Sequence, residues 1–347
     1  MPDDFLTRVG IAQPIVLGPM AGGAGTPALV AAVSNGGGLG SWGGAYSTPQ
    51  QILDAAVQIR ALTSKPFALN LFAGGYNPER HVDPAPMLAL MARVHGELGL
   101  PPPVLPPNPV SPLREQIDAV IEARPAMFSF TFGIPDADAL ARVRKAGILI
   151  CGTATTLDEA KALADAGVDC ISAQGEEAGA HRGTFLASFD ASLVPMRELV
   201  QGAVAAVSVP VFAAGGIMDG RDIAAVLKLG AAAAQMGTAF LPCPECGTPQ
   251  AHKAALMSAK IDTTTITRAF SGRQARALRS AFIDAAREEW ILPFRQQNDL
   301  TRPMRTAAGQ RGKADYLSLW AGRGVTRARQ MPAAELMKTL VAEIGGR

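Results

Sequence analysis

The residue best suited to proton chemistry is a histidine with glycines close on either side. His181 occurs in QGEEAGAHRG at 174–183, seven residues beyond the expected end of a buried strand. Imidazole can hydrogen-bond an anion or move a proton near neutral pH, and its small neighbours leave room for a ligand. We therefore predict that His181 is catalytic. The alternatives are a loop histidine that only bonds backbone, or proton transfer by Glu176 or Glu177, although such carboxylates are more often solvated or paired with Arg182.

Two glycine-bearing turns near residues 211–241 could bind a phosphate. Gly215 and Gly216 end one apolar run, residues 235–238 end the next, and an amphipathic segment separates the runs. Glycine has no Cβ to hold a phosphate away from the main chain, and paired turns of this kind cradle phosphate in the last units of many (β/α)8 barrels. We predict a phosphate-bearing cofactor here. The alternative is that the glycines only make a tight strand-to-helix turn.

The elements that must position these residues alternate between strand and helix. The helices expected between the strands include two that open with a Thr-Pro cap, at 26–27 and 48–49. Continuous apolar runs separated by helices indicate buried parallel strands. The predicted strands are 14–18, 39–42, 66–72, 126–132, 148–151, 168–174, 209–214 and 232–235. This pattern predicts a (β/α)8 TIM barrel, an α/β fold, and no G-x-G-x-x-G opens the first unit as a dinucleotide-binding fold requires.

Polar residues fall at the ends of several of these strands. Asn70, Gln174, Gly216 and Gln235 all lie at expected carboxyl ends, which form the catalytic face of such a barrel. Asn70 is polar within an apolar run and needs a hydrogen-bond partner.

The rest of the chain predicts a small, mainly helical second domain near the C-terminus. We expect the barrel at 1–241, the helical domain at 242–312 and a tail at 313–347 that packs back on the barrel. Helices are expected at 87–98, 248–259, 272–289 and 333–344, and Arg268, Arg273, Arg276 and Arg279 are expected to form a solvated helix face. The proline-rich excursion at 73–112 could be a lid over the barrel mouth or a connector.

Composition excludes several classes of protein. A net charge of +2 with dispersed arginines argues against nucleic-acid binding, and no apolar run reaches the roughly 18 residues of a membrane span. Four cysteines in 347 residues do not make a disulfide framework, and MPDDFLTRVG has no apolar signal region, so we expect a cytoplasmic protein. Cys243, Cys246 and His252 offer three ligands where structural zinc needs four, so we expect no metal.

Several motifs together resemble the nitronate monooxygenases, also called 2-nitropropane dioxygenases. They are PMAGG at 19–23, QGEEAGAHRG at 174–183, AAGGI at 213–217, QMGTAFL at 235–241, LPFRQQNDLTRPMR at 292–305 and LWAGRG at 319–324. The last two resemble the tail of the first class of that family. The likeness spans most of the chain, and only the combination is specific.

The resemblance implies a barrel that binds FMN and oxidises alkyl nitronates, such as propionate 3-nitronate, with O2 to a carbonyl compound and nitrite. By resemblance, His181 would bind the nitro oxygens, acting first as an electrostatic donor and as a base only for neutral nitroalkanes. Met20 and Ala21 would line the flavin through backbone, and Asn70 and Gln174 would bind ring or ribityl oxygens. The residues implied at the ribityl phosphate are Gly179, Gly215, Gly216, Gln235, Met236, Gly237 and Thr238.

Two departures and two alternatives qualify the resemblance. Ala180 stands where a second glycine is common, and Phe294 where tyrosine is usual. An FMN-dependent NAD(P)H reductase on the same barrel, of the enoyl-acyl carrier protein or quinone reductase kind, is the nearest alternative. A flavin-free lyase or isomerase for a sugar phosphate is the other. The physiological nitronate and the choice between monomer and homodimer stay open.

Overall fold

A computed structural model describes residues 2–75, 82–108, 110–260 and 263–346. Eight parallel strands form one sheet in the order β1-β9-β8-β6-β5-β4-β3-β2, and a bridge between Val16 and Leu39 joins its two ends. The strands are β1 Ile15–Leu17, β2 Gly40–Gly43, β3 Phe67–Phe72, β4 Met127–Thr131, β5 Leu149–Ala154, β6 Cys170–Gln174, β8 Val211–Ala214 and β9 Ala233–Met236. The predicted (β/α)8 barrel is confirmed.

The barrel helices begin where the sequence supplies capping side chains. Thr26, Thr48, Asp136, Thr156 and Asp219 each accept a backbone N–H at a helix start, which satisfies donors that the helix itself cannot pair. These helices are α2 Pro27–Asn35, α3 Pro49–Leu62, α6 Ala137–Lys145, α7 Leu157–Asp165 and α9 Gly220–Lys228, joined in the outer layer by α5 Leu113–Ala123 and α8 Met196–Ala206. No helix among the described residues is long and apolar enough to span a membrane.

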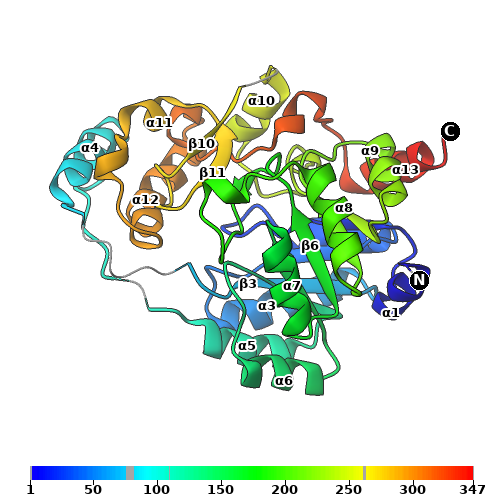
Figure 1. The fold of residues 1–347 in the computed structure, drawn as a ribbon. Helices are drawn as coiled ribbons and strands as arrows, with labels where there is room; N and C mark the ends of the chain where they lie inside the picture. Colours follow the sequence, from blue (N-terminus) through cyan, green and yellow to red (C-terminus); the bar gives the residue numbers. More distant parts are fainter. Residues whose placement is uncertain (1, 76–81, 109, 261–262, 347) are drawn as a thin grey trace.

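The two ends of the chain lie on the same side of the molecule in the view of Figure 1. Helix α1, Pro2–Val9, buries Phe5 and Val9 in a cluster with strand residues such as Phe212. Helix α13, Ala333–Ile344, packs on α2 and α9 through Leu336, Met337 and Leu340. The division of the chain at 241 and 312 stays a prediction.

A second apolar cluster lies beyond the mouth of the barrel. It joins α4, Ala85–Glu97, to α11, Ala281–Ala285, and α12, Gln296–Gln310, so it takes in residues outside the range 242–312. Helix α4 packs on α12, which makes this part of the 73–112 excursion a piece of a hydrophobic core (Figure 1). Residues 76–81 and 109 of the excursion lie outside the described part of the chain. Helix α10, Gln250–Ser258, lies within the expected 248–259.

The helix expected at 272–289 is wrong. Residues Ala275–Leu278 form strand β11, which pairs antiparallel with β10, Thr264–Thr267, and with β7, Ala180–His181. The four arginines at 268, 273, 276 and 279 do not form one solvated helix face either, and of these Arg279 is the exposed one. Arg268 and Arg276 are buried, and the Arg276 guanidinium donates to the Glu176 carbonyl at 3.0 and 3.1 Å. A remote carbonyl therefore satisfies Arg276, whereas Arg268 donates to the Gly272 carbonyl at 3.0 Å and pairs with the Glu288 carboxylate.

Candidate active site

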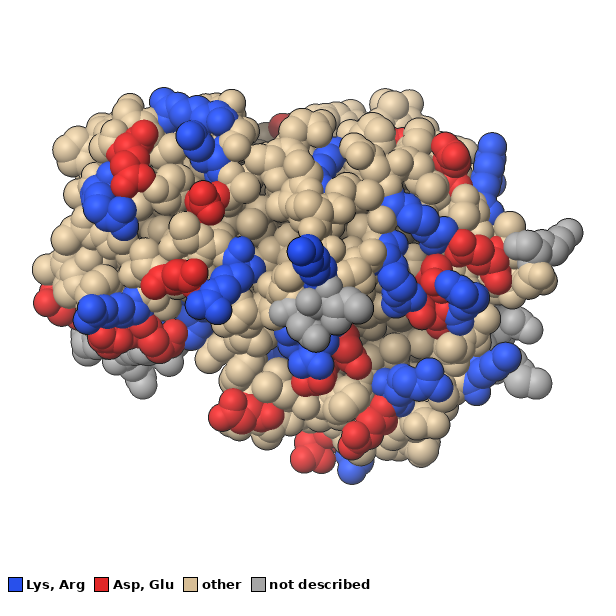
Figure 2. Space-filling model, turned by 90° about the horizontal axis from the view of Figure 1, so that it is seen from above, with Lys and Arg blue, Asp and Glu red and all other residues tan. Residues whose placement is uncertain are grey.

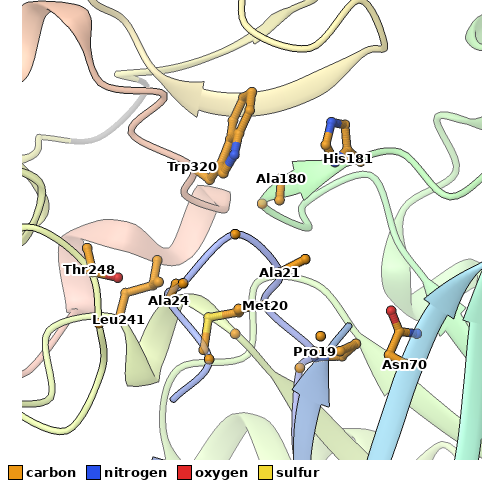
Figure 3. A pocket seen from close by; sticks show the side chains of 18 of the residues that line it. Pro19, Met20, Ala21, Ala24, Asn70, Ala180, His181, Leu241, Thr248 and Trp320 are labelled. Atoms are coloured by element: carbon orange, nitrogen blue, oxygen red, sulfur yellow. The ribbon is translucent and has the colours of Figure 1, made fainter. Parts of the chain in front are cut away.

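A cavity of about 1060 Å³ opens at the carboxyl ends of the barrel strands. The loop after β1, with Pro19, Met20 and Ala21, forms its floor, and Asn70 projects from the end of β3 (Figure 3). His181 and Trp320 lie across the cavity from Asn70 (Figure 3). The residues predicted to bind the cofactor all line this one cavity: Met20, Ala21, Asn70, Gln174, Gly179, Gly215, Gly216, Gln235, Met236, Gly237 and Thr238.

The first glycine turn has a backbone that favours glycine, and the second leaves open space beside its backbone. Gly215 and Gly216 have φ values of 122° and 70°, in the region that favours glycine. A Cβ added to Gly237 would meet nothing within 4 Å, so space for a ligand lies against the backbone there. The C-terminal tail also reaches this place, because the N–H of Gly322 donates to the Thr238 hydroxyl at 3.0 Å.

His181 is held on a short strand rather than on a free loop. It pairs with Ala275 of β11, and its ring contacts four aromatic rings at centroid distances between 5.6 and 6.1 Å. These belong to Phe72, Phe132, Phe294 and Trp320. The preceding Ala180 has φ 61°, a conformation that costs a non-glycine residue about 1 kcal/mol.

The histidine ring is uncharged at neutral pH. Burial, together with the positive charges of Arg273 and Arg305, lowers the pKa of His181 to about 3. Its Nε2 lies 2.9 Å from the Ser271 hydroxyl, and that hydroxyl donates to the Arg273 carbonyl at 3.0 Å. Because serine has one hydroxyl proton, we assign Nε2–H of His181 as the donor to Ser271. Nδ1 then carries the free lone pair and can accept a proton.

Gln174 holds the histidine segment in place. Its Nε2 donates to the His181 carbonyl at 3.0 Å, and its Oε1 accepts the Gly183 N–H at 2.8 Å. The guanidinium of Arg182, which is buried, donates to the same Oε1 at 3.3 Å and to the Gly175 carbonyl at 2.7 Å. A flavin contact by Gln174 stays a prediction, and its amide already positions the loop.

Replacing Gln174 with leucine should loosen this loop. The Gly183 N–H and the Arg182 guanidinium would lose an acceptor in a buried place, which costs about 1–3 kcal/mol of stability. Hydrogen exchange of the Gly183 amide should accelerate about tenfold or more, and Gln174→Glu, which keeps an acceptor oxygen, should change it less. Equal protection of Gly183 in the wild type and the leucine variant would contradict this role.

A buried carboxylate anchors the next stretch of the loop. Glu159 of α7 is fully buried and accepts hydrogen bonds from the Phe185 and Leu186 N–H groups at 2.6 and 3.0 Å. It also accepts from the Thr184 hydroxyl at 2.7 Å and from the N–H and hydroxyl of Thr155. Sequence reasoning missed this residue because an acidic residue in the first turn of a helix is usually solvated.

The other candidate acids and ligands are engaged elsewhere. Glu177 accepts the Met196 N–H at the start of α8, and Glu176 pairs with Arg323 at 3.1 Å. The Cys246 thiol donates to the Ala24 carbonyl at 3.1 Å, and His252 Nε2 lies 3.2 Å from the Trp320 carbonyl. Within the described ranges, no group of three or more His, Cys, Asp or Glu residues could hold a metal ion.

Comparisons with known proteins agree on one family. A family model described as nitronate monooxygenase matches residues 3–343. The chain is 41% identical to a nitronate monooxygenase from Pseudomonas aeruginosa over the full length of both, and 38% identical to a probable nitronate monooxygenase from Staphylococcus aureus over 97% of this chain and 95% of that protein. A solved nitroalkane oxidase from Streptomyces ansochromogenes superposes with a TM-score of 0.90 at 37% identity, covering 98% of each chain. FabK from Thermotoga maritima superposes with a TM-score of 0.76 at 26% identity, over 99% of this chain and 96% of that one.

Proposed function

The chain belongs to the nitronate monooxygenase family and is an oxidoreductase, and from that premise we propose that it oxidises alkyl nitronates with FMN and O2 to a carbonyl compound and nitrite. We use propionate 3-nitronate as the example substrate in the experiments below. The observation that supports the proposal best is the meeting of the glycine turns, the amide side chains and His181 in one cavity.

The residues present suit FMN. Its phosphate needs N–H donors and close backbone approach, which Gly216 and the open space beside Gly237 offer. Its polar ring edge needs hydrogen-bonding groups, and Asn70 lines the same cavity with its amide donating to the Ser129 hydroxyl at 2.9 Å. Bound FMN supplies the redox chemistry, and the protein supplies position and electrostatics.

The task we assign to His181 is proton transfer. A nitronate arrives already deprotonated, so the histidine has no proton to remove and only orients it. A neutral nitroalkane must first lose a proton from the carbon that bears the nitro group. Nδ1 of the uncharged imidazole is the proposed acceptor, because the nitronate anion formed beside it would stabilise the imidazolium that burial otherwise disfavours. The lowered pKa of His181 argues against a role as a positively charged donor to the nitro oxygens.

The reductase alternative rests on a specific likeness, the superposition on FabK from Thermotoga maritima. Both nitronate oxidation and the reductase reaction would use a site that contains the His181 segment. The substrate that the protein turns over must therefore distinguish the two functions.

Oxygen uptake by the FMN-reconstituted protein tests the proposal. We expect uptake and nitrite release with propionate 3-nitronate, and no fast bleaching of the flavin when NADH or NADPH is mixed in anaerobically. Fast bleaching without nitronate turnover would instead favour the reductase. A protein that stays colourless after FMN treatment does not bind the flavin, and that result would contradict the proposal.

A further inference from the structure

One segment of the C-terminal tail crosses the loops that we propose bind the FMN phosphate. We call this segment, residues 321–329, the strap, and its Gly322 lines the cavity. The N–H of Gly322 donates to the Thr238 hydroxyl in the second glycine turn at 3.0 Å. The N–H of Arg323 donates to the Glu177 carbonyl, also at 3.0 Å. The strap is therefore bonded to the loop after β6 and to the turn after β9.

The strap packs on these loops backbone to backbone. A Cβ added to Gly322 would lie 2.6 Å from the Glu177 carbonyl oxygen, and one added to Gly324 would lie 2.8 Å from the Gly216 carbonyl oxygen. From the barrel side, a Cβ added to Gly179 would lie 2.6 Å from the nitrogen of Gly322. Because contacts this short exclude any side chain, these glycines allow the close approach of two main chains. The strap thus lies directly on the proposed phosphate cradle.

Arg327 fastens the strap to the barrel through three acceptors. Its guanidinium lies 2.7 Å from the Asp222 carboxylate and 3.2 Å from that of Asp219, at the start of α9. It also donates to the Gly216 carbonyl at 3.0 Å, within the first glycine turn. A planar guanidinium that meets several acceptors fixes their relative positions better than a single surface ion pair does. Arg327 therefore joins the strap, the glycine turn and α9.

The strap also neutralises acids that lie beside the cradle. Asp219 and Asp222 follow the first glycine turn, and Glu176 lies in the loop after β6. A phosphate bound at these turns would be repelled by uncompensated carboxylates. Arg327 pairs with both aspartates, and Arg323 pairs with Glu176 at 3.1 Å. The cations of the strap thus make the cradle more favourable for an anion.

We propose that the strap retains the phosphate end of FMN and that Arg327 is the positioning residue that holds it closed. The inference rests on the proposed function, through its cofactor. The Arg327 side chain is 44% exposed, so dissolved salt screens its ion pairs. FMN should therefore leave the protein faster at high ionic strength.

The rate of FMN release tests the strap without turnover. The fluorescence of free flavin is followed after the loaded protein is diluted. We expect Arg327→Met to raise the dissociation rate about tenfold, and Arg327→Lys to raise it less. Arg221→Met is the matched control: Arg221 pairs with the same Asp219 at 3.1 Å, but it is 84% exposed and belongs to α9. Its loss should change the rate by less than about twofold.

Two further measurements test the strap without the loss of Arg327. Gly324→Ala keeps every charge but forces the strap away from Gly216, so it should also raise the release rate. Salt should raise the release rate of the wild type, and should raise that of Arg327→Met by a smaller factor.

The outcomes separate the strap from the proposed function. Equal release rates in Arg327→Met and Arg221→Met, from a wild type that binds FMN, would overturn the strap and leave nitronate oxidation in place. A wild-type release rate that does not depend on salt, together with an unchanged rate in Gly324→Ala, would do the same. A wild type that binds no FMN would overturn both proposals.

Discussion

His181→Asn should lower kcat/KM for a neutral nitroalkane by about 10²–10⁴-fold, the usual contribution of a positioned base. Asparagine can still hydrogen-bond but cannot accept a proton. Propionate 3-nitronate needs no proton removal, so its turnover should fall much less. The measurement is oxygen uptake with the two substrates at one pH, and both proteins should hold FMN. Equal losses with both substrates would remove the role as base and leave only an orienting role.

The pH dependence gives an independent check on His181. With a pKa near 3, the imidazole stays uncharged from pH 5 to 8, so kcat/KM for propionate 3-nitronate should show no ionisation of this group near 6.5. Ser271→Ala removes the acceptor of Nε2–H and should reduce nitroalkane turnover more than nitronate turnover. A histidine titration near 6.5 in the free enzyme would contradict the buried, uncharged ring.

Glu159→Ala should destabilise the protein by about 2–4 kcal/mol, because several donors around the buried carboxylate would lose their acceptor. The thermal midpoint should fall by several degrees. Asp158→Ala, at the preceding residue, is the control: that carboxylate is 87% exposed and lies 3.9 Å from Lys161, so its loss should cost under about 0.5 kcal/mol. Similar midpoints for the two variants would contradict the anchoring role.

The stabilisation by Glu159 also has a direction in pH. Burial raises the pKa of this carboxyl, and the hydrogen bonds from Thr155, Phe185, Thr184 and Leu186 outweigh burial, so its pKa is lowered in the folded protein. The contribution is then fully present above the unfolded pKa of about 4.3 and is lost as pH falls through the lower, folded value. The difference in midpoint between wild type and Glu159→Gln should therefore shrink below about pH 4. A difference that grows on acidification would reverse the assignment.

The barrel could be predicted because its signals are local. Each strand is a continuous apolar run, and the helices open with caps such as Thr48 or Asp136 a few residues away. Once the strands are placed, Asn70 and Gly216 fall at carboxyl ends by position alone. The predicted cofactor residues line one cavity because the carboxyl ends of the parallel strands lie together at one end of the barrel.

What could not be predicted depends on pairing across long stretches of sequence. The Ala275–Leu278 strand pairs with Thr264–Thr267 and, through Ala275, with His181 far away in the chain, and neither pairing shows in residues 272–289 by themselves, which resembled a helix. The roles of Glu159 and Arg276 could not be predicted for the same reason, because their partners include loop backbone groups that only the folded chain brings near.

The surface charges add little to recognition. On the face shown in Figure 2, basic and acidic side chains are interspersed. With a net charge of +2, such a surface gives weak long-range attraction for an anionic substrate. Discrimination then falls to groups inside the cavity.

The pairing of β7 with β11 divides the active site between two distant segments of the chain. Barrel turns form the proposed cofactor cradle. His181 is instead positioned by its pairing with Ala275 of β11, 94 residues later in the chain. A chimera that takes residues 263–292 from a relative would therefore replace the strand that positions His181 and would leave the glycine turns unchanged. Such grafts offer a route to altered proton transfer at constant flavin affinity.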